Sequence, residues 1–289
     1  MTRVADLVEL VRAPAALSVP GDVVAGAAAA GALGPRTPAL ATASVLLYWA
    51  GMAANDWADR KLDAVERPER PIPSGRISPG AAVGLAAGLT AAGVGLAAAA
   101  GGRRAAAVAV PLAATIWGYD LLAKNTAAGP AVMAACRGLD VLLGAAGGRP
   151  LRALPAAVTV AAHTWTVTAL SRREVDGADK GLPLRTLAGT ALVAASAAVP
   201  PGRRAVGAVA AALPAVLAGW YAARYGAAQA RVVSEPTAGR VRAAVGAGIT
   251  GLPALQGALT ARAGAGLLGV AVAAAAPLGR RLARKVSPT

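Results

Sequence analysis

Acidic residues in this sequence are concentrated in two short segments. The chain has 14 Asp and Glu residues, and eight of them are Asp56, Asp59, Asp63, Glu66 and Glu69 in the first segment and Glu174, Asp176 and Asp179 in the second. Carboxylates gathered in this way repel one another unless cations lie among them. Hard divalent cations prefer oxygen ligands, and Mg²⁺ takes one or two carboxylates while substrate phosphate completes its shell. The two segments therefore predict a magnesium-dependent site for a diphosphate.

The spacing in the first segment favours one face of a helix. Asn55, Asp56, Asp59 and Asp63 are separated by intervals of three, four and seven residues. A helix that continues for two turns past Trp57 would place them together. We expect metal ligands at Asn55, Asp56, Asp59, Asp63, Glu174, Asp176 and Asp179. Four of these, Asp59, Asp63, Asp176 and Asp179, are expected to be catalytic.

Basic residues flank both acidic segments and are suited to bind phosphate oxygens. The residues expected to contact the diphosphate are Arg60, Lys61, Arg67, Lys124, Arg173 and Lys180, with Lys124 also catalytic. The alternative is a solvated face joined by weak ion pairs. Two acidic clusters beside membrane spans on one inner face favour the functional interpretation.

Long apolar stretches must position these segments. The chain is 56% hydrophobic and 15% charged with a mean hydropathy of +0.55, which indicates a membrane protein. Stretches long enough to cross a bilayer run at 14–34, 37–55, 79–101, 105–123, 128–147, 153–171, 184–201, 205–225, 240–261 and 263–279. We expect an all-α polytopic bundle of nine or ten transmembrane helices. Because no linker or composition break divides residues 1–289, we expect one domain.

The distribution of charge predicts the orientation. A net charge of +15 in a soluble protein would suggest nucleic-acid binding. Here the cations lie between apolar spans, which fits lipid headgroups better and excludes a nucleic-acid partner. Most of the 29 Lys and Arg residues fall on one side if the N-terminus is inside. We therefore expect a multi-pass cell-membrane protein with the N-terminus, a short amphipathic helix at residues 1–12 and both acidic segments in the cytosol. The basic tail, residues 280–285, favours ten crossings, or nine with a re-entrant or interfacial helix.

Four polar side chains inside the spans are candidates for binding an acceptor substrate. These are Asp22, Arg137, Asp140 and His163. Ionisable groups at membrane depth are costly and mark functional sites. A packing role is the alternative: Arg137 and Asp140, three residues apart, could form a pair within their helix, and His163 could be satisfied by a neighbouring hydroxyl.

Both acidic segments resemble motifs of the UbiA superfamily of intramembrane prenyltransferases, in its bacterial UbiA-like branch. The run NDWADRKLD at 55–63, followed by RPIPSG at 70–75, resembles the first aspartate-rich motif, N-D-x-x-D-x-x-x-D with its R-P-x-P-S-G extension. The run SRREVDGADKG at 171–181 resembles the second motif, although Glu174 stands where the family has Asp. Tyr119 and Lys124 resemble a tyrosine and a lysine that follow the fourth span, which adds Tyr119 to the residues expected to bind diphosphate.

The resemblance implies about nine helices around a central cavity that both motifs cap. It implies Mg²⁺, a prenyl diphosphate donor, membrane lipids as surroundings and a small acceptor, either an aromatic ring or a polyol. The expected reaction is transfer of the prenyl group to that acceptor. Two alternatives remain: a terpene cyclase that uses the same donor without an external acceptor, and an isoprenoid-lipid carrier or structural membrane protein without turnover.

Overall fold

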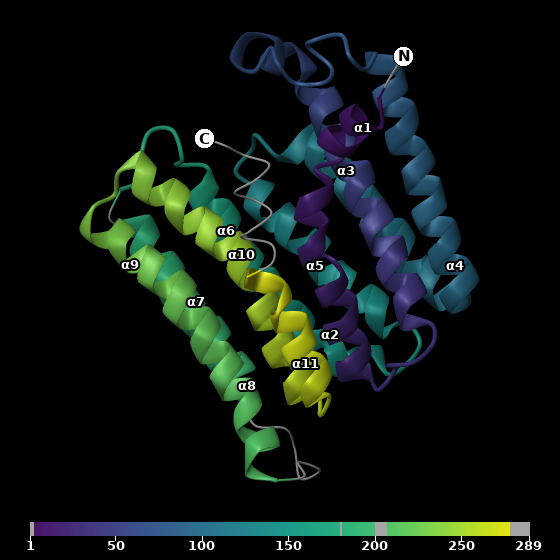
Figure 1. Cartoon of the computed structure of the whole chain (residues 1–289). Helices are drawn as coiled ribbons and strands as arrows, with labels where there is room; N and C mark the ends of the chain where they lie inside the picture. The colour runs from purple at the N-terminus through teal and green to yellow at the C-terminus, as the bar shows by residue number, and fades with distance from the viewer. Residues whose placement is uncertain (1–2, 180, 200–206, 278–289) are drawn as a thin grey trace.

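The computed structural model describes residues 3–179, 181–199 and 207–277, and every regular element in these ranges is helical. The α-helices are α1 (Val4–Leu10), α2 (Pro20–Ala30), α3 (Thr37–Glu66), α4 (Pro79–Gly118), α5 (Gly129–Ala145), α6 (Leu154–Ser171), α7 (Gly181–Ala197), α8 (Ala208–Tyr221), α9 (Ala227–Ser234), α10 (Ala238–Arg262) and α11 (Gly266–Ala273). Short 3-10 segments, η1 (Ala13–Ser18) and η3 (Pro150–Ala153), and π segments, η2 (Tyr119–Ala123) and η4 (Ala222–Gly226), join some of them. Proline stands in the first turn of α2 to α6, where its missing N–H costs nothing. The predicted all-α bundle is confirmed (Figure 1).

Helix α4 consists of two arms that meet at Gly102. This residue has φ 65° and ψ −158°, which are not helical values. Nε1 of Trp117 donates a hydrogen bond of 3.1 Å to Oγ1 of Thr90, although the two residues lie on opposite sides of Gly102. The arms therefore fold back on each other and correspond to the predicted spans 79–101 and 105–123.

Each of the ten predicted spans overlaps a helical segment of the described residues, and the spans 184–201, 205–225 and 263–279 also include positions outside them. By length and composition alone, three helices could cross a membrane: Thr37–Glu66, Pro79–Ala123 and Pro150–Ser171. Helix α11 belongs to a shorter apolar helical stretch, Gly266–Pro277, at the end of the described residues. The basic tail at 280–285, which favoured a tenth crossing, lies outside the described residues.

Helices α2 and α5 pack backbone against backbone. A Cβ atom built on Gly144 would lie 2.0 Å from the carbonyl oxygen of Val23, and one on Gly26 would lie 1.8 Å from that of Val141. Glycine lets helices approach closely in a bilayer, where packing joins them. This contact brings the intramembrane residues of α2 beside those of α5.

We expect Gly144→Ala to destabilise the protein, because its methyl group has no space against Val23. Overpacking of this kind costs about 1–3 kcal/mol. Gly88→Ala in α4 is the matched control: a Cβ there meets nothing within 4 Å, so no loss of stability is expected. Unfolding curves in mild detergent would measure both. Equal stability of the two variants would contradict the close α2–α5 packing.

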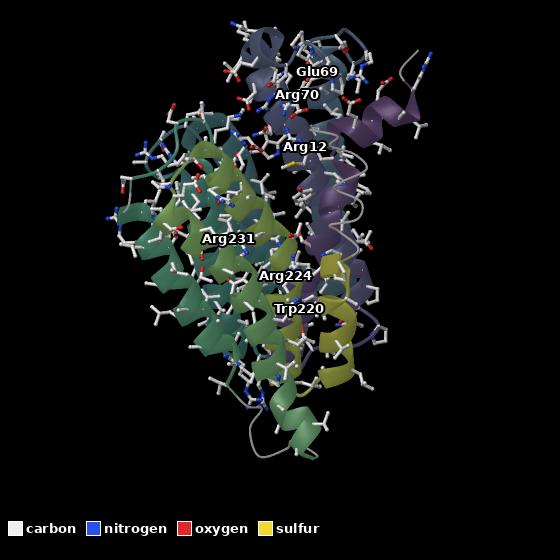
Figure 2. All side chains as sticks on the ribbon, turned by 60° about the vertical axis from the view of Figure 1, so that its left-hand side comes forward. Arg12, Glu69, Arg70, Trp220, Arg224 and Arg231 are labelled. Atoms are coloured by element: carbon white, nitrogen blue, oxygen red, sulfur yellow. The ribbon has the colours of Figure 1, made fainter. Side chains whose placement is uncertain are left out.

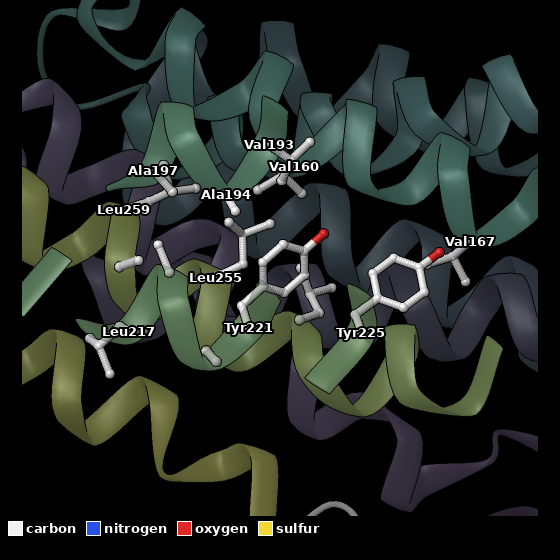
Figure 3. Packing of buried hydrophobic residues seen from close by; sticks show 14 of the residues in the cluster. Val160, Val167, Val193, Ala194, Ala197, Leu217, Tyr221, Tyr225, Leu255 and Leu259 are labelled. Carbon is white, nitrogen blue, oxygen red and sulfur yellow. The ribbon is translucent and has the colours of Figure 1, made fainter. Parts of the chain in front are cut away.

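The remaining helices pack around a second apolar core. Tyr221 and Tyr225 are fully buried there with Val160, Val193 and Leu255 (Figure 3). This core joins helices α6 to α11 and η4 and also includes Ala25 of α2 and Val141 of α5, whereas another cluster joins α2 to α5. The two acidic segments thus lie on different helix groups and must meet at one end of the bundle.

Candidate active site

The first acidic segment occupies the end of α3 and divides into two strips. Successive helical residues point about 100° apart, so Asn55 and Asp56 cannot share a direction. Asp56 and Asp63, seven residues apart, are buried on one strip. Asn55 and Asp59, four apart, form the adjacent strip. All four side chains nevertheless project within an arc of about 100°, so the expected single helix face is confirmed, with the two strips as its edges.

The strip of Asp56 and Asp63 is neutralised by two arginines. Arg70 Nη1 lies 2.7 Å from Asp63 Oδ2 and 3.4 Å from Asp56 Oδ1. Arg12 Nη2 lies 2.7 Å from Asp56 Oδ1. Figure 2 shows Arg12 and Arg70 at the same end of the molecule. These contacts place two guanidinium groups against the two buried carboxylates and partly offset the cost of burying them.

The other strip contacts the π segment η2. Lys124 Nζ forms an ion pair of 2.6 Å with Asp59 Oδ1. Asn55 Nδ2 donates a hydrogen bond of 3.0 Å to Asp120 Oδ1. Asp120 is buried and was not singled out from the sequence. Its position in an apolar span, four residues before Lys124, was the available signal.

The second acidic segment lies at the same end of the bundle (upper end in Figure 1). Arg172 Nη1 donates to the carbonyl of Thr126, two residues beyond Lys124. Arg242 Nη1 donates a bond of 2.8 Å to the carbonyl of Glu174. Burial raises the pKa of Glu174, and the nearby Arg242 and Arg67 oppose that shift. Since Arg67 follows α3, the two segments are electrostatically coupled.

Asp176 and Asp179 are both exposed. Oδ1 of Asp179 accepts bonds of 2.8 and 2.9 Å from the N–H groups of Gly181 and Leu182, which cap the first turn of α7. These backbone bonds, the one from Leu182 above all, lower the pKa of Asp179. The carboxylate is thereby held ionised at neutral pH and keeps its second oxygen for another ligand.

The remaining cations predicted to bind diphosphate have different surroundings. Arg60 folds back over the ring of Trp57, 4.6 Å from its centroid, and donates to the Trp57 carbonyl. Lys61 and Arg173 are exposed. Lys180 lies outside the described residues. Lys124 is the predicted cation that makes a direct ion pair with the first segment.

A cavity of about 100 Å³ opens beneath the first segment. Its walls come from α3, the second arm of α4, η2 and α5, and most of its lining is apolar. Its polar side chains include Tyr48, Tyr119, Asp120, Arg137 and Asp140. All of its lining residues belong to the first 140 residues of the chain, from Val19 to Asp140.

The intramembrane polar residues form a network at the lower end of this cavity. Arg137 Nη2 lies 2.8 Å from Asp22 Oδ2, and Gln256 Nε2 donates to Asp22 Oδ1 at 2.6 Å. Asp140 instead accepts a bond of 2.5 Å from Ser44. The ion pair of Arg137 with Asp140 that we considered from the sequence is therefore wrong. The close packing of α2 on α5 places the carboxylate of Asp22 beside Arg137 instead.

His163 lies in the other helix group. Its Nδ1 is 2.8 Å from Oη of Tyr221, and its ring meets Tyr225 edge-on. It does not line the described cavity. A histidine satisfied by a neighbouring hydroxyl, the packing alternative, agrees with this environment.

The residues fit magnesium in donor chemistry. Within the described ranges, no group of three or more His, Cys, Asp or Glu side chains is arranged to hold a metal ion. Mg²⁺ does not need such a cage, since one or two carboxylates, water and phosphate oxygens suffice. Asp59 and Asn55 offer oxygen atoms beside Lys124 and above the cavity. The metal ligands therefore remain a prediction, in which oxygen atoms of the diphosphate complete the coordination of Mg²⁺.

An all-helical bundle with acidic and basic clusters at one end, above a cavity, defines a class of membrane proteins that bind a charged head group over an apolar chamber. The sequence matches the family model described as "UbiA prenyltransferase family" over residues 18–232. The chain belongs to the UbiA prenyltransferase family. It is a prenyltransferase that acts in a membrane.

Similar proteins agree with this assignment. The digeranylgeranylglyceryl phosphate synthase of Natronomonas pharaonis is 35% identical over 192 residues, 65% of this chain and 69% of that protein. The one from Halobacterium salinarum is 33% identical over 191 residues, 63% and 67% of the two chains. A structure from work on digeranylgeranylglyceryl phosphate synthase in membranes has a TM-score of 0.68 at 17% identity, covering 91% and 99%. The apo structure of a UbiA homolog from Aeropyrum pernix K1 has a TM-score of 0.65 at 20% identity, covering 88% and 96%.

Proposed function

We propose that this protein transfers a prenyl group from a polyprenyl diphosphate to a hydroxyl group of a small acceptor, with Mg²⁺ bound at the first acidic segment. The observation that carries this proposal is that Asp120 lines a mostly apolar cavity and is bonded to Asn55. Lys124, four residues after Asp120, forms an ion pair with Asp59. The anionic diphosphate of the donor would bind at the polar end of the cavity, and its isoprenoid chain would lie against the apolar wall.

Asp59, Asn55 and, from the second segment, Asp176 and Asp179 are the residues we assign to metal. When bound, Mg²⁺ would neutralise diphosphate oxygens and stabilise them as a leaving group. Lys124 would exchange its ion pair with Asp59 for a diphosphate oxygen, and Tyr119, which lines the cavity, would donate to another. The C1–O bond of the donor breaks with its electron pair on the departing diphosphate, the acceptor oxygen bonds to C1, and the hydroxyl proton passes to the diphosphate or to water.

The lower end of the cavity supports a hydroxyl-bearing acceptor. Arg137 is neutralised by Asp22, whereas Asp140 has Ser44 as its hydrogen-bond partner and can accept a second bond. The relatives' name describes a glyceryl phosphate product, which agrees with an alcohol acceptor. The cavity is smaller than the roughly 300–1,000 Å³ of ordinary ligand pockets. Consequently, a long prenyl tail would leave it toward the lipid.

A transfer assay in vesicles tests the proposal. With Mg²⁺, geranylgeranyl diphosphate and a panel of glyceryl and polyol acceptors, we expect release of diphosphate and formation of a prenyl ether, and chelation by EDTA should abolish both. If the acidic segments face the cytosol of the cell membrane, inside-out vesicles should consume added donor and right-side-out vesicles should not. A hydrocarbon product without acceptor would instead indicate a cyclase. No diphosphate release under any condition would indicate a carrier.

A further inference from the structure

The segment before α2 reaches the first acidic segment. Residues 3–17 precede the region that matches the family model, which begins at residue 18. Helix α1 nevertheless lies across the end of α3, and Arg12, just after α1, contacts Asp56. The first acidic segment therefore receives a cation from a part of the chain that the family match does not include.

Arg12 adopts a costly backbone conformation at this point. It has φ 47° and ψ 50°, and among the described residues it is the one non-glycine with positive φ. Side chains with a Cβ disfavour this left-handed region, and such outliers persist where the surroundings enforce them. The chain turns sharply there between α1 and η1, and this turn directs the Arg12 side chain toward α3.

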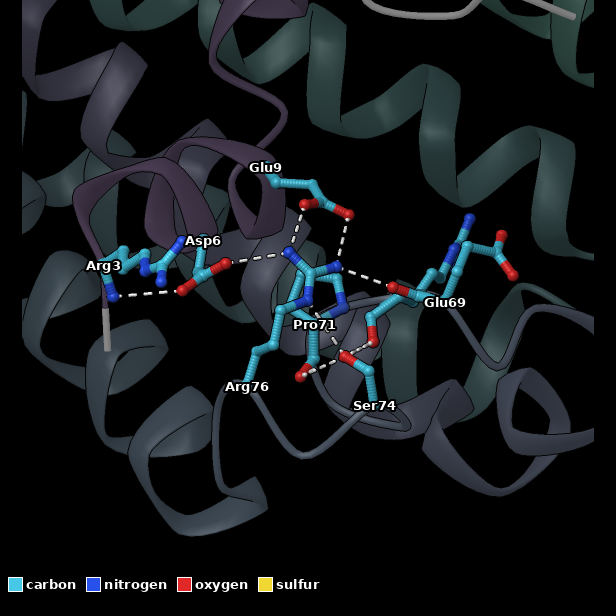
Figure 4. Close-up of polar contacts among 8 residues, drawn as sticks. Arg3, Asp6, Glu9, Glu69, Pro71, Ser74 and Arg76 are labelled. Carbon is cyan, nitrogen blue, oxygen red and sulfur yellow. Dashed lines mark hydrogen bonds and ion pairs between the residues drawn. The ribbon is translucent and has the colours of Figure 1, made fainter. Parts of the chain in front are cut away.

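Arg76 fixes α1 against the loop that follows the first acidic segment (Figure 4). Its Nη1 lies 2.8 Å from Asp6 Oδ1, and its two Nη atoms lie 2.6 and 3.0 Å from the Glu9 carboxylate. Nη2 also donates to the Glu69 carbonyl and Nε to Ser74 Oγ. These contacts use all five donors of the guanidinium.

Two of the groups joined at Arg76 have pKa values shifted in favour of their charged forms. A backbone bond from Arg3, followed by the bond from Arg76, lowers the pKa of Asp6. Bonds to Glu9 and Asp6 raise the pKa of Arg76. We call Asp6, Glu9 and Arg76 the N-terminal clamp.

The Arg12 guanidinium is available for a further ligand. Its side chain is 39% exposed, whereas that of Asp56 is 6% exposed. One N–H group bonds to Asp56, and the others make no hydrogen bond with the described residues. Arg70, by comparison, is 20% exposed and bridges Asp63 and Asp56. An exposed, planar donor beside the first acidic segment matches the oxygen pattern of a diphosphate.

We propose that Arg12 is a further diphosphate-binding residue and that the N-terminal clamp is the positioning device that presents it. This inference rests on the proposed function for its substrate. Arg12 contacts the donor, whereas Arg76 acts through α1. Loss of Arg12 should therefore weaken binding of the donor and leave binding of the acceptor unchanged.

Two variants and one control test this inference. Arg12→Gln is expected to raise the KM for prenyl diphosphate about tenfold or more, with the KM for the acceptor unchanged and partial rescue in Arg12→Lys. Arg76→Gln should give a smaller rise of the same kind, since it displaces Arg12 without altering its charge. Arg36→Gln is the control, because Arg36 is exposed and precedes α3 at its other end.

Titration of each folded variant with inorganic diphosphate and Mg²⁺ separates this inference from the proposed function. Weaker diphosphate binding in Arg12→Gln would support the inference even if no acceptor were turned over. Unchanged diphosphate affinity and unchanged donor KM in both Arg12→Gln and Arg76→Gln would overturn it. Equal changes in the two KM values, together with a lower Tm, would assign Arg12 to structure alone and would also overturn it.

Discussion

Asp59→Asn is expected to reduce kcat/KM for prenyl transfer about 10³-fold, a loss of roughly 4 kcal/mol of transition-state stabilisation. Asp59 is the carboxylate that contacts Lys124, at 2.6 Å, above the cavity. Asparagine preserves its shape but removes the charge that pairs with Lys124 and that we propose binds the metal ion. Negative charge that develops on the leaving diphosphate would then lack prearranged partners. Steady-state assays in detergent or vesicles, at saturating acceptor, would measure the change.

Glu66→Gln is the matched control for Asp59→Asn. Glu66 lies on the same helix, seven residues further, and is exposed. It belongs to the acidic segment but makes no contact with Lys124, so its substitution should leave kcat/KM within about threefold. If Asp59→Asn kept the activity of Glu66→Gln while both variants folded, Asp59 would have no place in the site.

The helical fold could be predicted from the sequence because a bilayer leaves few alternatives. Backbone groups in hydrocarbon must bond within their own segment, so long apolar stretches become helices. Even the point at Gly102 where α4 folds back on itself lies between two predicted spans, 79–101 and 105–123. Helix ends were less predictable: the first span was expected at 14–34, whereas α2 begins at Pro20, after the 3-10 segment η1.

The composition of the candidate site could be predicted in part. Local spacing indicated the acidic residues of α3 and the cation Lys124, and the structure brings Asp59 and Lys124 together. The partners Arg12 and Asp120 could not be chosen from spacing, because they lie 44 and 65 residues from Asp56 and Asn55. Such pairings depend on how helices pack, and one sequence does not specify that.

The same limit applied to Arg137, whose partner proved to be Asp22 on another helix. Packing through Gly26 and Gly144 sets this pairing. An ion pair within one helix stabilises that helix, whereas an ion pair between two helices stabilises their packing. We therefore expect the ion pair of Arg137 with Asp22 to hold α2 and α5 together.

Arg137→Met is expected to destabilise the folded protein by about 3–5 kcal/mol, because it leaves the carboxylate of Asp22 buried without its cation. Asp22 is 0% exposed, and Gln256 alone would remain to bond it. Met replaces most of the apolar volume of arginine, so the loss reports charge rather than a cavity. Unfolding of the detergent-solubilised protein by a denaturing detergent would measure it.

The double variant Arg137→Met/Asp22→Asn provides the decisive comparison. Once both charges are absent, no uncompensated ion remains, and much of the lost stability should return. Arg104→Met, at an exposed position in α4, should change stability by less than about 0.5 kcal/mol. If the stability losses of the two single variants, at Arg137 and at Asp22, simply added up in the double variant, the ion pair itself would contribute nothing to stability. Its role in joining α2 to α5 would then have to be abandoned, together with its role in leaving Asp140, which is bonded to Ser44, without an arginine partner.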